Sequence, residues 1–190
     1  MLSGLSSSAR RMTGSGGGRL FSELETRTRS DEPAGRPDAG PRRPHPLAAI
    51  LVGGLVAGVI DLTYAIVVYS PKAPIRIPQS VAAGVLGRAT SFASGWRSAA
   101  LGVVLHFTIA MIWATIYFVA SRRLPILIRR PVPCGLAYGA FVFLFMRLVV
   151  LPLSAIGPSH MRPVPMVAEF VEHWLGVGLP IALSVRRFSR

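Results

Sequence analysis

Four long apolar stretches, separated by polar connections, dominate the sequence after residue 46. They occupy residues 47–69, 99–120, 135–153 and 166–185. Each has about the 20 residues that a helix needs to cross the ~30 Å hydrocarbon core of a bilayer. Backbone polar groups in lipid must be satisfied within the segment, so each stretch is predicted to be helical. The pattern predicts an all-α membrane protein, a four-helix up-and-down transmembrane bundle.

The connection between the first two spans carries a weaker pattern of its own. Its proline-rich start disfavours a helix, but residues 78–93 predict a short one with Pro78 near its beginning. Ala, Gly and Ser dominate this segment, and Arg88 interrupts it. We expect a short interfacial helix lying on the membrane surface, with a re-entrant segment as the alternative.

Composition supports a membrane protein and argues against a soluble one. Of the 190 residues, 51% are hydrophobic and only 15% are charged. The net charge of +13 comes almost wholly from arginine, since Lys72 is the only lysine. The arginines cluster at the ends of the spans, where they suit anionic lipid headgroups, and not among exposed aromatic residues, so nucleic acid is not an expected partner. The single cysteine, Cys134, excludes an intrachain disulfide.

Residues 1–46 differ from the rest of the chain. They hold seven Gly, seven Ser, five Pro and eight Arg without apolar periodicity. Such a composition cannot bury enough apolar surface to order itself, so a disordered basic N-terminal tail is predicted, followed by a transmembrane domain at 47–187. A start codon assigned too far upstream would produce the same kind of tail.

The distribution of arginine predicts the orientation. If the N-terminus is in the cytoplasm, so are the short loop between the second and third spans and the C-terminus. These two segments carry seven arginines: Arg122, Arg123, Arg129, Arg130, Arg186, Arg187 and Arg190. The opposite side of the membrane has fewer basic residues, and they are spread over longer loops. The positive-inside rule therefore favours cytoplasmic N- and C-termini in a bacterial inner membrane. His160, in the outer loop, is expected to be solvated.

Six ionisable residues interrupt the apolar spans: Asp61, His106, Arg147, Glu169, Glu172 and His173. At ~1.5 Å of rise per residue, they lie about 5 to 12 Å in from the outer ends of their helices. Facing lipid, each charged side chain would cost on the order of 2.5 to 3.5 kcal/mol. We therefore expect the six to converge as one buried polar cluster near the outer face of the membrane.

Small residues share helix faces with these polar groups. They are Gly54, Gly58, Gly102, Gly135, Gly139 and Gly176. Glycine lets helix backbones approach closely, so the face that is small and polar is predicted to be the inward one. These glycines are the expected helix-packing residues.

The cluster has three interpretations. Arg147 needs a carboxylate partner, Glu169 or Glu172, and with neutral histidines two negative charges remain. The cluster could fix helix register in a structural or partner-binding membrane subunit, with a homo-oligomer as one form of it; no catalytic set is predicted. It could belong to a proton- or cation-conducting transporter or channel component. It could also hold haem between His106 and His173, or a transition metal on residues drawn from His106, Glu169, Glu172 and His173.

Three segments resemble the YagU-like family of small bacterial inner-membrane proteins, over roughly residues 99–187. They are VLHFTIAMIWATIYFVASRRLP, GLAYGAFVFLFMRLVVLPLSAIGP and AEFVEHWLG with the later arginine pair. The matching features fall on His106, Pro152, Glu169 and His173. The resemblance implies the fold and the bacterial inner membrane. It adds no activity, because the family has no known function, and it does not extend to Asp61.

Overall fold

The computed structural model describes residues 45–157 and 163–189, and the side chains of all of these except 163 and 164. Every described helix lies in the compact unit Arg42–Arg190. No strand occurs among the described residues, and the predicted all-α membrane bundle is confirmed. The predicted disordered tail falls outside the described residues except for positions 45 and 46, and so does His160.

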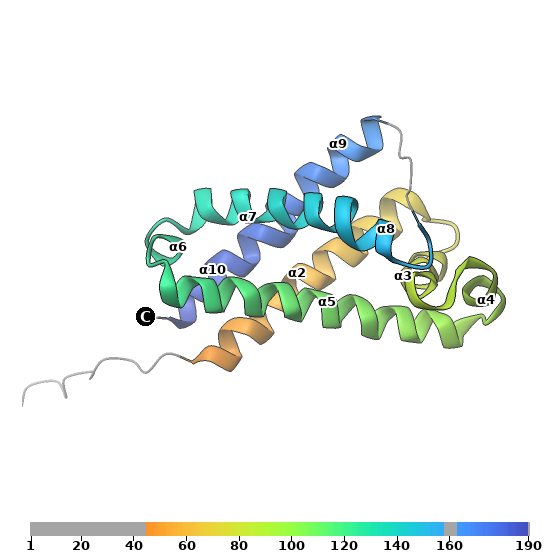
Figure 1. Cartoon of the computed structure of the whole chain (residues 1–190), viewed down its shortest axis with the longest axis horizontal. Coiled ribbons are helices and arrows are strands. Elements are labelled where there is room, and N and C mark those ends of the chain that lie inside the picture. Colours follow the sequence, from red (N-terminus) through yellow and green to blue (C-terminus); the bar gives the residue numbers. More distant parts are fainter. Residues whose placement is uncertain (1–44, 158–162, 190) are drawn as a thin grey trace, which may run out of the picture. The chain divides into compact units, whose positions relative to one another are not determined.

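Four helical segments are long and apolar enough to cross a membrane, which indicates a multi-pass membrane protein. The first two are α2 (Pro46–Tyr69) and α5 (Trp96–Arg123). The third comprises α7 (Pro131–Phe145), η1 (Met146–Val150) and α8 (Leu151–Leu153), and the fourth comprises α9 (Pro163–Glu172), η2 (His173–Gly178) and α10 (Leu179–Phe188). The start of α2, α6 (Ile126–Arg129) and the C-terminus lie at one end, and α3, α4 and α8 at the other (Figure 1).

The connection between α2 and α5 holds two short helices where one was predicted. They are α3 (Arg76–Leu86) and α4 (Arg88–Ala93), separated at Gly87. Gly87 has φ +75°, a left-handed conformation that ends α3 and that glycine adopts without a Cβ penalty. A Cβ on Gly102 of α5 would collide with the carbonyl oxygen of Pro78, so α3 packs directly against α5.

The fourth membrane segment is the most enclosed of the four. In its most apolar stretch 39% of the residues are buried, against 17–22% in the other three. It packs against α2 on one side and α7 on the other. The remaining helix surfaces expose large apolar side chains, such as Leu55, Val104 and Leu148, as expected for surfaces that contact lipid.

Both π-helical segments come shortly before a proline inside a membrane helix. Pro152 follows η1, and Pro180 follows η2. A proline in a helix lacks the N–H that would bond to residue i−4, and its ring clashes with that carbonyl. Widening the preceding turn to π geometry relieves the clash. Neither π segment was predicted, because the face assignments assumed a regular α-helical repeat.

Aromatic side chains fill the space between α5 and α7. Trp113 makes edge-to-face contacts with Tyr138, Phe141 and Phe145 at centroid distances of 5.4–6.1 Å. The Tyr138 hydroxyl donates a hydrogen bond of 2.7 Å to the Trp113 carbonyl. Large rings hold these two helices farther apart than the glycine contacts hold α7 and η2, which leaves room for a cavity.

A buried hydrogen bond between α10 and α2 provides a test of the packing. The Ser184 hydroxyl donates a hydrogen bond of 2.9 Å to the Ala49 carbonyl. We expect Ser184→Ala to lower the free energy of unfolding by about 0.6 kcal/mol, the mean for such bonds between membrane helices. Denaturation in mixed detergent micelles measures it. Thr108→Ala is the control, because that exposed hydroxyl bonds only within α5. Equal losses in both variants would contradict the assignment.

Candidate functional site

All three carboxylate side chains in the sequence after Asp38 come from membrane helices. Asp61 lies on α2, and Glu169 and Glu172 lie on the last turn of α9. His173 begins η2, and His106 lies in the first half of α5. Helix α2 packs against both α5 and η2, so these residues approach one another from three membrane segments.

The imidazole of His173 is held by its own helix. Its Nδ1 lies 3.0 Å from the Glu169 carbonyl oxygen and 2.9 Å from Oε2 of Glu172. A carbonyl oxygen only accepts hydrogen bonds, so Nδ1 carries a proton and donates a hydrogen bond to the backbone carbonyl of Glu169. In the neutral ring Nε2 is then an acceptor. The edge of the ring also contacts Phe143 of α7, with centroids 5.5 Å apart.

Glu172 is the most unusual member of the group. Its side chain is only 5% exposed, and although Oε2 lies near His173, neither carboxylate oxygen accepts a hydrogen bond from the described residues. A Cβ on Gly176, one turn later, would collide with Oε1 of Glu172, so this glycine lets the carboxylate fold back over η2. A buried carboxylate with an unpartnered oxygen is costly unless a positive charge, a protonated His173 or a bound cation, neutralises it.

On the opposite side, His106 and Asp61 join α5 to α2. Nε2 of His106 donates a hydrogen bond of 2.9 Å to the Gly58 carbonyl and lies 3.9 Å from Oδ2 of Asp61. The carbonyl again fixes the tautomer, so Nδ1 of the neutral ring is an acceptor. A Cβ on Gly58 would lie 2.8 Å from the Phe107 ring, so this glycine permits the close approach of the two helices.

Asp61, Glu172 and His173 form the tightest group. Each offers one possible ligand atom, and these atoms lie within 4.8 Å of one another. The sequence pointed to His106, Glu169, Glu172 and His173 as metal ligands, and of these Glu172 and His173 belong to the group that the fold assembles. Asp61 replaces His106 because the His106 ring turns to the Gly58 carbonyl.

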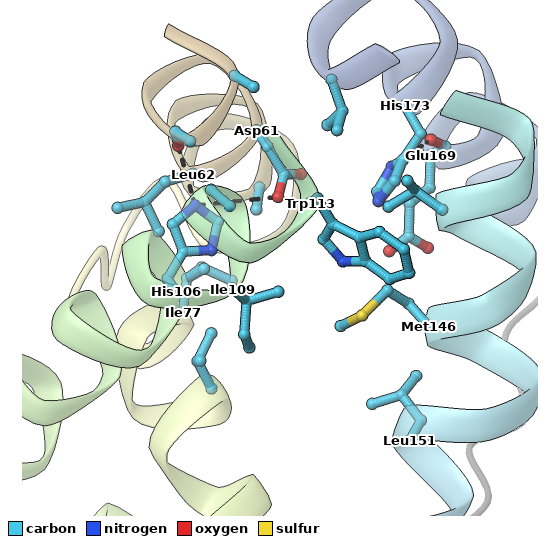
Figure 2. Close-up of a pocket in the computed structure, with 17 residues that line it drawn as sticks. Asp61, Leu62, Ile77, His106, Ile109, Trp113, Met146, Leu151, Glu169 and His173 are labelled. Carbon is cyan, nitrogen blue, oxygen red and sulfur yellow. Dashed lines mark hydrogen bonds and ion pairs between the residues drawn. The ribbon is translucent and has the colours of Figure 1, made fainter. Parts of the chain in front are cut away.

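A cavity of about 230 Å³ is lined by Asp61 and His173 of this group, but not by Glu172. Figure 2 shows Asp61 and His106 on one side of it and Glu169 and His173 on the other, with Trp113 between them. Apolar residues of α2, α3, α5, α7, η1, α8 and η2 line the rest. Small-molecule pockets span about 300–1,000 Å³, so this cavity suits an ion or a small polar molecule better than a haem.

Arg147 lies on η1 and does not line the cavity. Its positive charge interacts with Glu169, one of the two partners expected from the sequence. Of the six predicted cluster residues, the structure thus brings Asp61, Glu172 and His173 closest together. His106 lies beside Asp61, and the backbone carbonyl of Glu169 lies beside His173.

Five of the six predicted packing glycines lie between membrane helices. Gly54 and Gly58 face α5, Gly135 and Gly139 face the fourth segment, and Gly176 faces α2. Gly102 differs, because it faces α3. Sequence reasoning missed Gly178, where a Cβ would collide with the Gly135 carbonyl. Pro180 was the feature of the sequence that could have indicated this contact, because the π-helical segment before it turns Gly178 toward α7.

Comparison with known proteins gives no relative: no family model, curated protein or solved structure matches the chain. The resemblance to YagU-like proteins therefore stays a prediction, and the function of the site has to be argued from its own chemistry.

Proposed function

We propose that this chain is a cation-binding subunit of the bacterial inner membrane, with the cation held inside the helix bundle by Asp61, Glu172 and His173. The observation that carries the proposal is the buried Glu172 carboxylate, which lies within 4.8 Å of ligand atoms of Asp61 and His173. Among the described residues its Oε1 has no partner, and its Oε2 has only the His173 ring beside it, at 2.9 Å. Buried charges in proteins are paired or coordinate metals.

The hydrogen-bonding roles of the side chains support a cation as the ligand. Both histidines donate to backbone carbonyls, so their second ring nitrogens are acceptors when the rings are neutral. The carboxylates of Asp61 and Glu172 are acceptors as well. The one donor facing this group is the Nδ1–H of His173, which lies near both the Glu169 carbonyl and Oε2 of Glu172. A cation would satisfy the lone pairs that this N–H leaves without a partner.

The arginine distribution supports a cytoplasmic location for both termini. Arg122 and Arg123 end α5, Arg129 lies on α6, and Arg186 and Arg187 lie near the end of α10, at the end of the bundle that holds the C-terminus (Figure 1). With this end in the cytoplasm, the cation site lies toward the periplasmic half of the membrane. The YagU-like resemblance agrees with a bacterial inner membrane.

Two other roles predict different behaviour. A transport component would use the cavity as the route to the site, but Tyr117, Ile181 and Val185 are at most 1% exposed in the cytoplasmic half, so passage would need a second conformation. A purely structural subunit would use the cluster as an interhelical clamp for a homo-oligomer or another membrane protein, as the bond from His106 to the Gly58 carbonyl suggests.

The test is thermal unfolding of purified, tag-free protein in detergent against Na⁺, K⁺, ammonium, Mg²⁺, Ca²⁺, Mn²⁺ and Zn²⁺. We expect at least one cation to stabilise the protein saturably, by about 2.7 kcal/mol at one hundred times its dissociation constant. A matching ionic strength of choline chloride controls for screening. Identical unfolding in all salts would overturn the proposal and favour the structural role.

A further inference from the structure

We infer that the cation is a divalent first-row transition-metal ion, with Asp61 and Glu172 as oxygen ligands and His173 as the nitrogen ligand. The inference rests on the proposed cation-binding function and names its ligand class. Three observations carry it independently: the balance of charge in the cluster, the mixture of ligand atoms, and the support behind His173.

The charge of the cluster points to a divalent ion. Arg147 interacts electrostatically with Glu169, so these two charges offset each other. With neutral histidines, two negative charges remain, on Asp61 and Glu172. These are the two carboxylates that approach each other and His173 within 4.8 Å. A divalent cation neutralises them completely, whereas a monovalent cation leaves one buried negative charge.

The ligand atoms point to a transition metal. Imidazole nitrogen suits Zn²⁺, Fe²⁺, Ni²⁺ and Cu²⁺, whereas Ca²⁺ takes six to eight oxygen ligands and Mg²⁺ a near-ideal octahedron of oxygens. One nitrogen and two carboxylates are too few oxygens for Ca²⁺, and they match sites that combine His with Asp or Glu. The mixed set therefore favours Mn²⁺, Fe²⁺, Co²⁺ or Zn²⁺.

The environment of His173 is the usual support for a metal ligand. Ligating histidines donate their other N–H to a carbonyl or carboxylate, which fixes the tautomer and orients the ring. Nδ1 of His173 makes this bond to the Glu169 carbonyl, and Phe143 holds the ring from α7. With Nδ1 donating to this carbonyl, Nε2 is the ring nitrogen left for a metal.

Titration of the chelator-treated, tag-free protein with Co²⁺ tests the inference. Nitrogen and oxygen ligands give Co²⁺ a visible absorption band, which reports binding without any activity assay. We expect one saturable site, displaced by Zn²⁺ and insensitive to excess Ca²⁺. Glu172→Gln and His173→Gln should each weaken Co²⁺ binding by about 100-fold or more, beyond the loss typical of residues that only support ligands.

Two further variants keep the test decisive. Asp61→Asn should weaken binding to a similar degree, and because the Asp61 side chain is 29% exposed, it serves if a buried variant does not fold. His45→Ala is the control for adventitious binding, since His45 precedes the start of α2; it should bind Co²⁺ like the wild type.

The outcomes separate this inference from the proposed function. No Co²⁺ or Zn²⁺ binding, together with stabilisation by Ca²⁺ or Na⁺, would overturn the transition-metal assignment and leave cation binding intact. Binding that only His45→Ala removes would overturn the ligand set. Failure of every cation to bind or stabilise would overturn both.

Discussion

Replacing Gly178 by alanine is expected to lower the free energy of unfolding by about 3 kcal/mol, the upper end of the range for overpacking. A Cβ at this position would collide with the Gly135 carbonyl and lie 2.7 Å from the Gly139 Cα. The contact is reciprocal, since a Cβ on Gly135 would lie 3.0 Å from the Gly178 carbonyl oxygen. These neighbours are backbone atoms, which cannot rotate away as a side chain can.

Gly84→Ala is the matched control for this substitution. Gly84 also lies within a helix, α3, but the nearest atom to its added Cβ is Ser154 Cβ at an ordinary 3.7 Å. Alanine should stabilise that helix by about 0.5–1 kcal/mol. Denaturant titrations followed by circular dichroism compare the two variants. Gly178→Ala with wild-type stability would contradict the close packing of α7 against η2.

Glu172→Gln is expected to raise the free energy of unfolding of the cation-free protein by about 1 kcal/mol, because it replaces a buried charge whose Oε1 has no partner among the described residues. The amide keeps the shape of the carboxylate, removes its repulsion with Asp61, and supplies N–H donors. Most substitutions of buried polar residues destabilise, so the sign of this effect is diagnostic.

In the presence of a saturating cation the order should reverse. The wild type gains about 2.7 kcal/mol at one hundred times the dissociation constant, and Glu172→Gln gains almost nothing. Parallel denaturation curves with and without the ion measure both differences. If Glu172→Gln is destabilised even without the cation, the cluster is an interhelical clamp, and the charge-based argument for a binding site is wrong.

Much of the fold could be predicted from the sequence because the bilayer restricts the choices. An apolar stretch of about 20 residues in lipid has to be helical, which placed all four membrane segments within a few residues of the structure. Glycines on the same face as polar residues correctly indicated close helix contacts at Gly58 and Gly139. These features depend only on local spacing and on the cost of exposing polar groups to lipid.

The details of the site depend on how each helix is rotated, which spacing alone does not determine. A regular α-helical repeat placed Glu169, Glu172, His173 and Gly176 on one face but not Gly178, which the π turn before Pro180 brings toward α7. Which partner His173 meets across the bundle depends on the crossing of α2 and η2. Asp61 reaches it, while His106 bonds to the Gly58 carbonyl.

Anomalous diffraction at the zinc absorption edge, from crystals grown in a lipid phase with Zn²⁺, tests the central claim most directly. The account predicts one strong peak bounded by Asp61, Glu172 and His173, and its loss in Glu172→Gln crystals grown in the same way. A peak elsewhere, or none between these three side chains, would contradict it.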